Sequence, residues 1–455
     1  MAAADLQQMA VAPRAPGEYA PAAGARAVEK LQHAAEPLRG ARVLHVSVAG
    51  AEGRVPELLG GLLPLAAGAG VEVEWRVLFG SPELRATAAA LQSGLRGGES
   101  GIEDAAWGEY LDACERTARS LGDRYDAIVL HDAALGLAAG LAKGQAADAP
   151  AGGGPAGAPA GGGLASGPSG GGLASGSAGG GPAILWRLHE DASHAEPDAL
   201  ARALALAERC SSVLVPHDSF APGGNGERPA ALAGDRLQIA PPGIDPLDPR
   251  NLQLEARLPG RVVRPLGVDL ERPFCLQVLE LDRWDDPHAA IDAFRLAKAE
   301  EPDLQLVLAA LLDRAATESW QAAKEISDYA QDTDGVLLLT TYEGLGSLEV
   351  GALLLLARTV IERSLREGFE LAPFEAFWKR TPVVGGPPFA IRDGVDGFLA
   401  PNEDEAAAHI VELVRDPGLA AEMGRAGRER VREHFLVTAA LERELRALAA
   451  SLRTR

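Results

Sequence analysis

The stretch RTVIERSLREGFELAPFEAFWKRTPVVGG, residues 358–386, decides the fold of this chain. It predicts a buried strand over 358–364, a helix that begins near Pro373, and a second buried strand over 382–386. Proline suits the first turn of a helix, because the N–H group that it lacks would have no intrahelical partner there. A strand, a helix and a second strand in this order form a βαβ unit, which is typical of a parallel sheet.

The same alternation of strands and helices continues outward from this unit. In the second half of the chain we expect further strands over 274–281, 304–312 and 335–342, with helices over 287–301 and 316–331. In the first half we expect strands over 42–50, 71–80, 125–132, 183–191, 211–219 and 236–245, with helices over 54–67, 108–121 and 197–209. The sequence therefore predicts the α/β class, with two Rossmann-like, doubly wound domains that face each other across a cleft. Ligands of such sheets bind outside the carboxyl ends of the strands.

A low-complexity segment interrupts the first set of strands. Residues 150–182 contain only Gly, Ala, Pro and Ser apart from two leucines, and the sequence GGGLASG occurs twice. Such a composition cannot bury enough apolar surface to offset the entropy lost on ordering. Because strands of one pattern continue on both sides, we interpret the segment as a disordered insertion within one domain and not as an interdomain linker.

These features divide the 455 residues into four parts. We expect a disordered N-terminal lead-in over 1–37 and an N-terminal Rossmann-like domain over 38–255. A C-terminal Rossmann-like domain of the donor-binding type follows over 256–435, and a final helix over 436–455 is expected to pack back on the first domain.

Composition excludes several classes of protein. The chain has 43 Lys and Arg against 64 Asp and Glu, a formal net charge of −21 that repels nucleic acid. Its three cysteines lack a CxxC spacing, which indicates buried, reduced thiols in a cytoplasmic protein and neither a disulfide framework nor a zinc site. No apolar run reaches the roughly 18 residues that a membrane span requires.

Two carboxylates in the opening stretch are candidate ligand-binding groups. Glu367 and Glu375 are separated by seven residues and lie between the strand end and the first turns of the helix. The amide groups of a helix N-terminus can receive anionic phosphates, and carboxylates can accept hydrogen bonds from sugar hydroxyls. Spacing alone leaves a solvated pair of glutamates as an alternative.

Several longer motifs accompany this stretch in a fixed order. They are WRLHEDAS (186–193), PPGIDPLDPRN (241–251), LQVLELDRWDDPHAAIDAF (276–294) and MGRAGRERVREHF (423–435). Together they resemble the glycosyl-transferring trehalose synthases, retaining enzymes of glycosyltransferase family 4 with the GT-B fold. The resemblance runs from about residue 38 to the C-terminus, apart from the insertion. It implies transfer of glucose from a nucleoside diphosphate glucose to a sugar acceptor, with no metal or other cofactor. A homodimer is an expectation on the same ground alone.

The resemblance also assigns roles to individual residues. It implies a catalytic set of Glu367 at the donor sugar with His189 and Asp191 near the reacting sugars. The residues that it implies in donor binding are Glu375 at the nucleotide ribose, Arg366, Gly368, Gly53 and Arg283. Strand alternation independently places His189 and Asp191 on one face, with Arg187. A structural, hydrogen-bonded role for His189 is the alternative, and a metal site there is not expected.

The chain departs from the family pattern where the donor diphosphate should bind. The family has an Arg and a Lys five residues apart after the first strand of the second domain, and the aligned residues here are Glu280 and Asp285. Glu370 occupies a glycine position, and AGAEGRVPELL (49–59) replaces a glycine-rich phosphate loop. A carboxylate that faces a phosphate disfavours binding. Cations that could form a rearranged anion site, if they converge on one point, are Arg283, Arg363, Arg366 and Lys379.

Two functional hypotheses follow. The first is a working, metal-independent, retaining hexosyltransferase whose partners are a sugar and a nucleotide sugar. The second is a catalytically lapsed homologue, a pseudo-glycosyltransferase that binds a sugar or a protein. The preserved order of the motifs favours the first hypothesis, and the acidic residues in the cleft favour the second.

Overall fold

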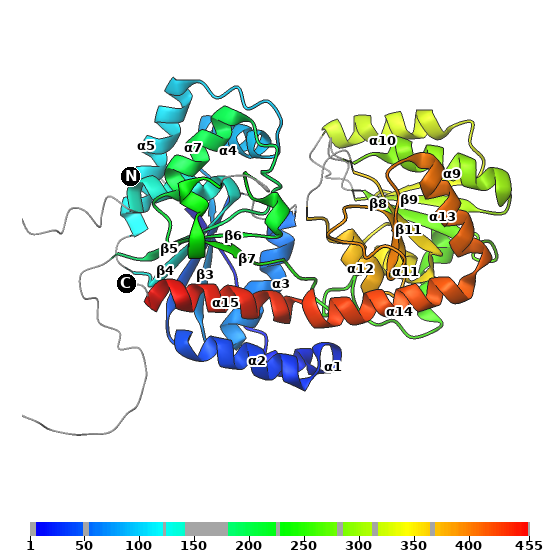
Figure 1. Cartoon of the computed structure of the whole chain (residues 1–455), viewed down its shortest axis with the longest axis horizontal. Helices are drawn as coiled ribbons and strands as arrows, with labels where there is room; N and C mark the ends of the chain where they lie inside the picture. Colours follow the sequence, from blue (N-terminus) through cyan, green and yellow to red (C-terminus); the bar gives the residue numbers. More distant parts are fainter. Residues whose placement is uncertain are drawn as a thin grey trace, which may run out of the picture.

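The computed structural model describes residues 6–48, 54–121, 124–141, 181–223, 228–279, 285–311, 317–364 and 369–453. They form two α/β domains that lie side by side (Figure 1). Domain 1 contains a seven-stranded sheet with the strand order β1-β3-β2-β4-β5-β6-β7, and domain 2 contains a six-stranded sheet with the order β10-β9-β8-β11-β12-β13. Two doubly wound domains were predicted, and this prediction is confirmed.

The elements of domain 1 follow the alternation seen in the sequence. Its strands are β1 (Leu6–Met9), β2 (Arg42–Ser47), β3 (Glu72–Leu78), β4 (Ala127–His131), β5 (Ala183–Arg187), β6 (Ser212–Val215) and β7 (Leu237–Ile239). Its helices are α1 (Ala20–Ala23), α2 (Ala25–Ala35), α3 (Arg54–Gly68), α4 (Pro82–Leu95), α5 (Asp104–Leu121) and α7 (Pro197–Ala207). All neighbouring strands are parallel except β1 and β3.

The elements of domain 2 form a wholly parallel sheet with helices on both faces. Its strands are β8 (Phe274–Leu279), β9 (Gln305–Ala310), β10 (Val336–Thr340), β11 (Thr359–Glu362), β12 (Val383–Gly385) and β13 (Gly397–Leu399). Its helices are α8 (Leu258–Val263), α9 (Pro287–Glu300), α10 (Thr317–Ala330), α11 (Ser347–Leu356), α12 (Ala372–Trp378), α13 (Glu403–Arg415) and α14 (Pro417–His434). Strands buried on both faces, such as β9, are mostly apolar, as expected for a parallel sheet; in β9 only the first residue, Gln305, is polar.

The strands that flank the low-complexity segment pair directly with each other. Ala127 of β4 lies opposite Ala183 of β5 in a parallel register that continues to His131 and Arg187. The segment therefore leaves and re-enters the same sheet. Most of it, residues 150–180, lies outside the described residues, as do residues 142–149 before it.

The prediction of a disordered lead-in over 1–37 was wrong for its described residues, 6–37. Leu6–Met9 forms the edge strand β1, and α2 buries Val28 and Leu31 against domain 1. The apolar residues of α2 recur at helical spacing, so the helix has one face that it can bury. Its partner is the last helix of the chain, which is far away in sequence.

That last helix, α15 (Val437–Arg453), leaves domain 2 and packs on domain 1. In Figure 1 it continues from the end of α14 and crosses beneath the sheet of domain 1, next to α2. Leu441, Leu445 and Leu448 are buried in one core with α2 and α3. At the crossing point Ile244 and Phe435 share a backbone hydrogen bond, N to O 2.9 Å. The chain thus connects the two domains twice.

Truncating the buried face of α15 should destabilise domain 1. We expect Leu445→Ala to lower the free energy of unfolding by about 2–5 kcal/mol, because Leu445 is 1% exposed and its removal leaves a cavity. The matched control is Leu296→Ala on α9, whose side chain is 44% exposed, with an expected change within about 0.5 kcal/mol. Chemical denaturation measures both, and equal effects would contradict the packing described.

Candidate functional site

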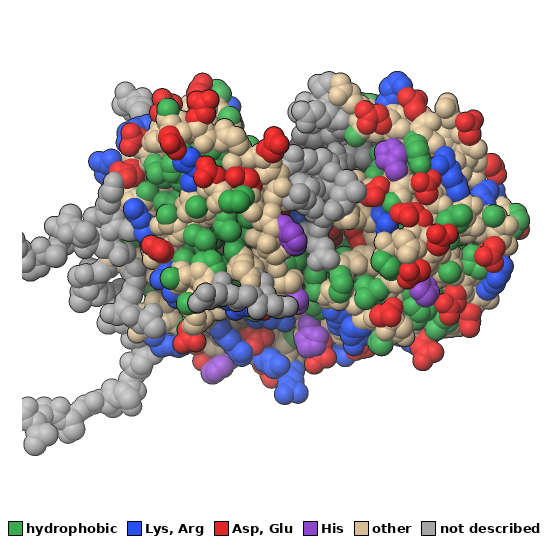
Figure 2. Space-filling view, turned by 45° about the horizontal axis from the view of Figure 1, so that its top comes forward, with side chains coloured by type: hydrophobic (Ala, Val, Ile, Leu, Met, Phe, Trp, Pro, Cys, Tyr) green, Lys and Arg blue, Asp and Glu red, His purple; other side chains and the backbone are tan. Residues whose placement is uncertain are grey.

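Each sheet has a switch point in its strand order. In domain 2 the order reverses between β8 and β11, and in domain 1 it reverses between β2 and β4. Ligands of doubly wound sheets bind at such switch points, beyond the carboxyl ends of the strands. Figure 2 shows the surface notched between the two lobes, with acidic side chains spread over both. The switch points are therefore where functional residues are expected.

A cavity of about 280 Å³ lies at the carboxyl ends of β11, β12 and β13. Its lining comprises Glu362, Arg363, Ser364, Glu370, Gly386, Pro387, Ala400 and Pro401. Two consecutive glycines shape its floor. Gly385 has φ +116°, and a Cβ there would lie 2.1 Å from the carbonyl oxygen of Glu362. This turn requires glycine, which lets the β12 loop approach β11 closely.

Glu362 is a buried carboxyl group at the end of β11. Its side chain accepts a hydrogen bond from the hydroxyl of Ser364 at 2.9 Å and is 7% exposed. Burial, reinforced by the nearby charges of Glu370 and Asp285, raises the pKa of Glu362 to about 8. At neutral pH the group is therefore mostly protonated and can donate as well as accept a hydrogen bond.

An ion pair between Arg54 and Glu370 joins the two domains at this cavity. Arg54, the first residue of α3 in domain 1, donates from Nη2 to both carboxylate oxygens of Glu370, at 2.7 and 2.8 Å. From the sequence Glu370 is only an added negative charge, and Arg54 is not recognised as its partner. The one feature that could have pointed to Arg54 is that a cation stands in the segment where the family resemblance leads us to expect glycines. Arg54 and Glu370 both depart from the family pattern, and their opposite charges compensate each other.

Glu375 lies on α12 and holds the segment that connects the domains. It is 1% exposed and pairs with Arg250 at 3.1 Å, and Asn251 lies 3.4 Å from its other oxygen. The charge of Glu375, acting against burial, raises the pKa of Arg250. Pro373 stands in the first turn of α12, as predicted. In this structure the carboxylate of Glu375 thus binds the segment that connects the two domains. Its role at the ribose of a nucleotide stays a prediction.

On domain 1, His189 belongs to a buried row of three histidines. His45 on β2, His131 at the end of β4 and His189 after β5 come from three adjacent strands. Nδ1 of His45 lies 3.1 Å from Nε2 of His131, and Nδ1 of His131 lies 2.9 Å from Nε2 of His189. The rings of successive histidines are stacked. The alternative of a hydrogen-bonded His189 is therefore realised, and it does not conflict with a role at a substrate.

Asp132 fixes the position of His189. Its Oδ1 accepts a hydrogen bond from the backbone N–H of His189 at 2.7 Å, whereas Oδ2 is buried without a partner. Burial, together with the charge of Glu190, raises the pKa of Asp132 well above its usual range. Its φ of +46° is uncommon for a residue other than glycine and indicates local strain, which is typical of functional sites.

The remaining predicted residues are only partly described. Asp191 is half-buried and accepts a hydrogen bond from the backbone N–H of Ser193 at 2.9 Å. Asp285 forms a β-bridge to Ser364 and so lies beside the cavity. The predicted residues that fall outside the described part of the chain are Gly53, Glu280, Arg283, Arg366, Glu367 and Gly368.

The described cations do not converge on one point. Arg363 lines the cavity but donates to the carbonyl of Ala400 and pairs with Glu403, both at 2.9 Å. Lys379 donates to the carbonyl of Leu252 at 2.6 Å, and burial lowers its pKa to about 8. These two side chains therefore do not form the rearranged anion site that was considered.

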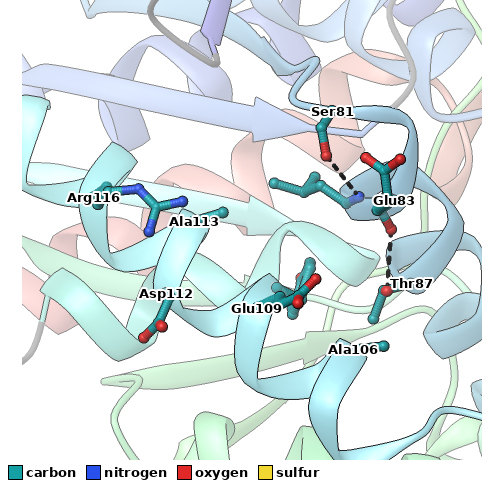
Figure 3. Close-up of a pocket in the computed structure, with 10 residues that line it drawn as sticks. Ser81, Glu83, Thr87, Ala106, Glu109, Asp112, Ala113 and Arg116 are labelled. Carbon is teal, nitrogen blue, oxygen red and sulfur yellow. Dashed lines mark hydrogen bonds between the residues drawn. The ribbon is translucent and has the colours of Figure 1, made fainter. Parts of the chain in front are cut away.

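A second cavity, of about 350 Å³, lies between α4 and α5 of domain 1 (Figure 3). Its labelled residues come from these two helices, and its hydrogen bonds are local, such as that from the hydroxyl of Thr87 to the carbonyl of Glu83. In Figure 1 α5 lies on the side of domain 1 that faces away from domain 2. None of the sequence motifs contributes to this cavity, so the functional site is placed at the domain boundary.

Three further observations concern the chemistry available. Cys114, Cys210 and Cys275 are buried free thiols, as predicted. The described residues hold no group of three or more His, Cys, Asp or Glu side chains that could bind a metal ion. Within the same ranges, none of the helices has the length and apolar character needed to cross a membrane.

Comparison with known proteins identifies the family. Residues 262–430 match the family model described as glycosyl transferases group 1, and residues 45–147 match that of the trehalose synthase N-terminal domain. The chain is 34% identical to the trehalose synthase of Rubrobacter xylanophilus over 437 residues, 93% of this chain and 94% of that protein. It belongs to the trehalose synthase family of glycosyltransferases. The trehalose synthase of Pyrococcus horikoshii is 27% identical, with 94% of each chain covered.

Solved structures of more distant proteins agree with the fold of this trehalose synthase family member. A UDP-forming α,α-trehalose-phosphate synthase from Burkholderia xenovorans has a TM-score of 0.62 at 14% identity, covering 91% of this chain and 99% of that one. Anabaena HepE, in complex with UDP and glucose, has a TM-score of 0.60 at 15% identity, and the match covers 90% of this chain and 100% of that one. These structures confirm the GT-B fold that the resemblance implied.

The raised pKa of Glu362 predicts a specific dependence of stability on pH. The folded protein holds this proton up to about pH 8, whereas the unfolded chain releases it near pH 4.5, so stability from Glu362 is lost as pH rises between these values. The slope is at most about 1.4 kcal/mol per pH unit. We expect Glu362→Gln to be more stable than the parent near pH 8, with a difference that shrinks towards pH 4.5. Urea denaturation at several pH values measures this, and a constant difference would show that Glu362 is ionised.

The ion pair between the domains predicts energetic coupling across the boundary. In a double-mutant cycle of Arg54→Met and Glu370→Gln, we expect a coupling free energy of about 1 kcal/mol, because both side chains are largely buried and the contact is bidentate. Denaturant unfolding of the four proteins measures it. The control cycle uses the exposed pair Arg415 and Glu301, for which no measurable coupling is expected. Coupling no larger than the control would mean that the pair does not hold the domains together.

Proposed function

We propose that this chain transfers a hexose from a nucleoside diphosphate sugar to a sugar acceptor, with retention at the anomeric carbon and without a metal. The observation that carries the proposal is the cavity at the switch point of domain 2, which holds Glu362 and Glu370 and is met by Arg54 from domain 1. Membership of the trehalose synthase family makes a nucleoside diphosphate glucose the first donor to test and glucose the first acceptor.

The donor is proposed to bind on domain 2. Its sugar hydroxyls suit the protonated carboxyl group of Glu362, which can both donate and accept, and Glu367, five residues later in the sequence, is proposed at the same sugar. HepE was solved with UDP and glucose, and its shared fold supports a nucleotide sugar as the ligand class. Glu375 is proposed to reach the ribose after exchanging Arg250 for that ligand.

Departure of the diphosphate is the step that needs positive charge. The bond between the anomeric carbon and the diphosphate oxygen breaks, a bond to the acceptor oxygen forms, the proton of that acceptor hydroxyl is released, and the nucleoside diphosphate leaves with an added negative charge. Glu280 and Asp285 cannot stabilise that charge. Arg54 is the cation proposed to do so after exchanging Glu370 for the phosphate, since its Nη2 already donates to both oxygens of a carboxylate at the cavity and phosphate oxygens are acceptors of the same kind.

The acceptor is proposed to bind against domain 1. His189 and Asp132 lie together at the carboxyl ends of β4 and β5, and Asp191 follows two residues after His189. A neutral imidazole and carboxylates in this arrangement can bind and orient sugar hydroxyls. The buried free thiols support a reducing compartment, and we propose that the protein acts in the cytoplasm.

Turnover with defined sugars tests this function. Incubation with a panel of nucleoside diphosphate glucoses and glucose should release nucleoside diphosphate and form a disaccharide whose transferred glucose keeps the α configuration, which proton NMR distinguishes. A chelator should leave the rate unchanged. We expect Glu367→Ala to lower kcat by at least about 100-fold, through loss of transition-state contacts with the donor sugar.

The matched control is Glu422→Ala, an exposed glutamate on α14, which should retain full activity. Calorimetric titration of the unaltered protein with the same donors accompanies the assay. Absence of both turnover and binding heat with every donor would overturn the proposal in favour of a lapsed homologue.

A further inference from the structure

The three buried histidines form one continuous hydrogen-bonded chain through domain 1. It begins at Nε2 of His45, passes through His131, and ends at Nδ1 of His189. All three side chains are nearly inaccessible, with 1% to 4% exposure. In the described part of the protein, no side chain forms a hydrogen bond with Nδ1 of His189 itself, so that atom is the end of the chain.

Each imidazole in this chain carries a single proton at neutral pH. Burial lowers the pKa of His45 to about 4, against the opposing effect of Glu444. Burial also lowers the pKa of His131 and of His189 well below the usual range, and the positive charge of Arg187 acts in the same direction on both. A neutral imidazole donates from one nitrogen and accepts at the other.

The chain therefore has only two proton arrangements. If His45 carries its proton on Nδ1, it donates to His131, which must then carry its proton on Nδ1 and donate to His189, leaving a proton on Nδ1 of His189. If His45 carries its proton on Nε2, every bond reverses, and Nδ1 of His189 is a free acceptor. The three tautomers change together, because each hydrogen bond needs one donor and one acceptor.

Glu444 of α15 distinguishes the two arrangements. Its Oε1 lies 3.9 Å from Nε2 of His45, is buried, and has no hydrogen-bond partner. A carboxylate oxygen attracts a proton on Nε2 and repels a lone pair there, and burial strengthens both effects. The other oxygen, Oε2, is held by Nη1 of Arg187 at 2.5 Å, which keeps Oε1 directed at His45.

We propose that Glu444, acting through His45 and His131, sets the tautomer of His189 so that its Nδ1 accepts a hydrogen bond from a sugar hydroxyl. The sugar part of this inference rests on the proposed function, whereas the tautomer part does not. Glu444, His45 and His131 are positioning residues, since none of them contacts the substrate. The C-terminal helix thus controls the hydrogen-bonding character of the cleft.

The substitution Glu444→Gln tests the tautomer directly. Arg187 can only donate, so it must face the amide oxygen, which places the amide NH2 group opposite Nε2 of His45. At the 3.9 Å separation the positive end of that amide dipole favours a lone pair on Nε2 of His45, so all three histidines should change from the Nε2–H to the Nδ1–H tautomer. Long-range nitrogen–proton correlation spectra of protein labelled with ¹⁵N-histidine report each tautomer, with assignments from single histidine substitutions.

Two further variants make the test decisive. Ser451→Ala removes another buried contact of α15, the 2.9 Å bond to Ser212, and should leave all three tautomers unchanged. In His45→Asn the amide can still form a hydrogen bond with His131, as donor or as acceptor, but Glu444 no longer determines which. His131 and His189 should then no longer be entirely in the Nε2–H tautomer. If His131 and His189 keep it in Glu444→Gln or in His45→Asn, or show Nδ1–H in the unaltered protein, the proposal is wrong.

Kinetics test the consequence for the substrate. We expect Glu444→Gln to lower kcat/KM for the acceptor at least about tenfold, the value of one lost hydrogen bond, with KM for the donor unchanged. A tautomer switch with unaltered acceptor kinetics would overturn the substrate part of the proposal. An unaltered protein that shows the expected tautomers but no turnover would instead contradict the proposed function.

Discussion

One buried ion pair, between Arg187 at the end of β5 and Glu444 on α15, connects the parts of this molecule on which its site depends. Arg187 and Glu444 are 4% and 1% exposed, and Arg187 also donates to the carbonyl of Ala240, so its charge is satisfied from two directions. Removing one partner of such a pair leaves an uncompensated buried charge, which costs about 3–5 kcal/mol. The pair therefore fixes where the last helix lies on domain 1, and with it the second connection between the domains.

Charge at the domain boundary is balanced locally. The net charge of −21 first indicates only that the protein avoids nucleic acid. Around the cavity the carboxylate of Glu370 is matched by Arg54, and Glu362 avoids its charge by keeping a proton. In this structure, two acidic residues of the cavity are thus neutralised, one by a cation and one by a proton. A count of charges in the sequence does not show such a pairing, because Arg54 lies on the other domain.

The fold was predictable from sequence to a large extent, and the site was not. The strands from β2 to β12 were located because buried parallel strands are continuous apolar runs bounded by turn residues. Helix α2 was missed because its apolar face is short, and only α15, some 400 residues later, shows what covers it. Arg54 and Glu444 could not be found for the same reason, since each acts through a partner on a distant element. His189 and His131 could be singled out by their positions at strand ends, but their contact with each other and with His45 depends on the order of strands in the sheet.

The return of α15 to domain 1 also determines the order in which the protein can be completed during synthesis. Domain 1 leaves the ribosome first, but its core under β2 and α2 stays open until the last residues of the chain arrive. Domain 2 has its own sheet and its own core, so it can close while domain 1 still lacks a helix. Domains generally fold from the N-terminal end as they emerge. In this chain the domain that is made first is finished last, and its apolar face beneath α15 stays uncovered in the interval.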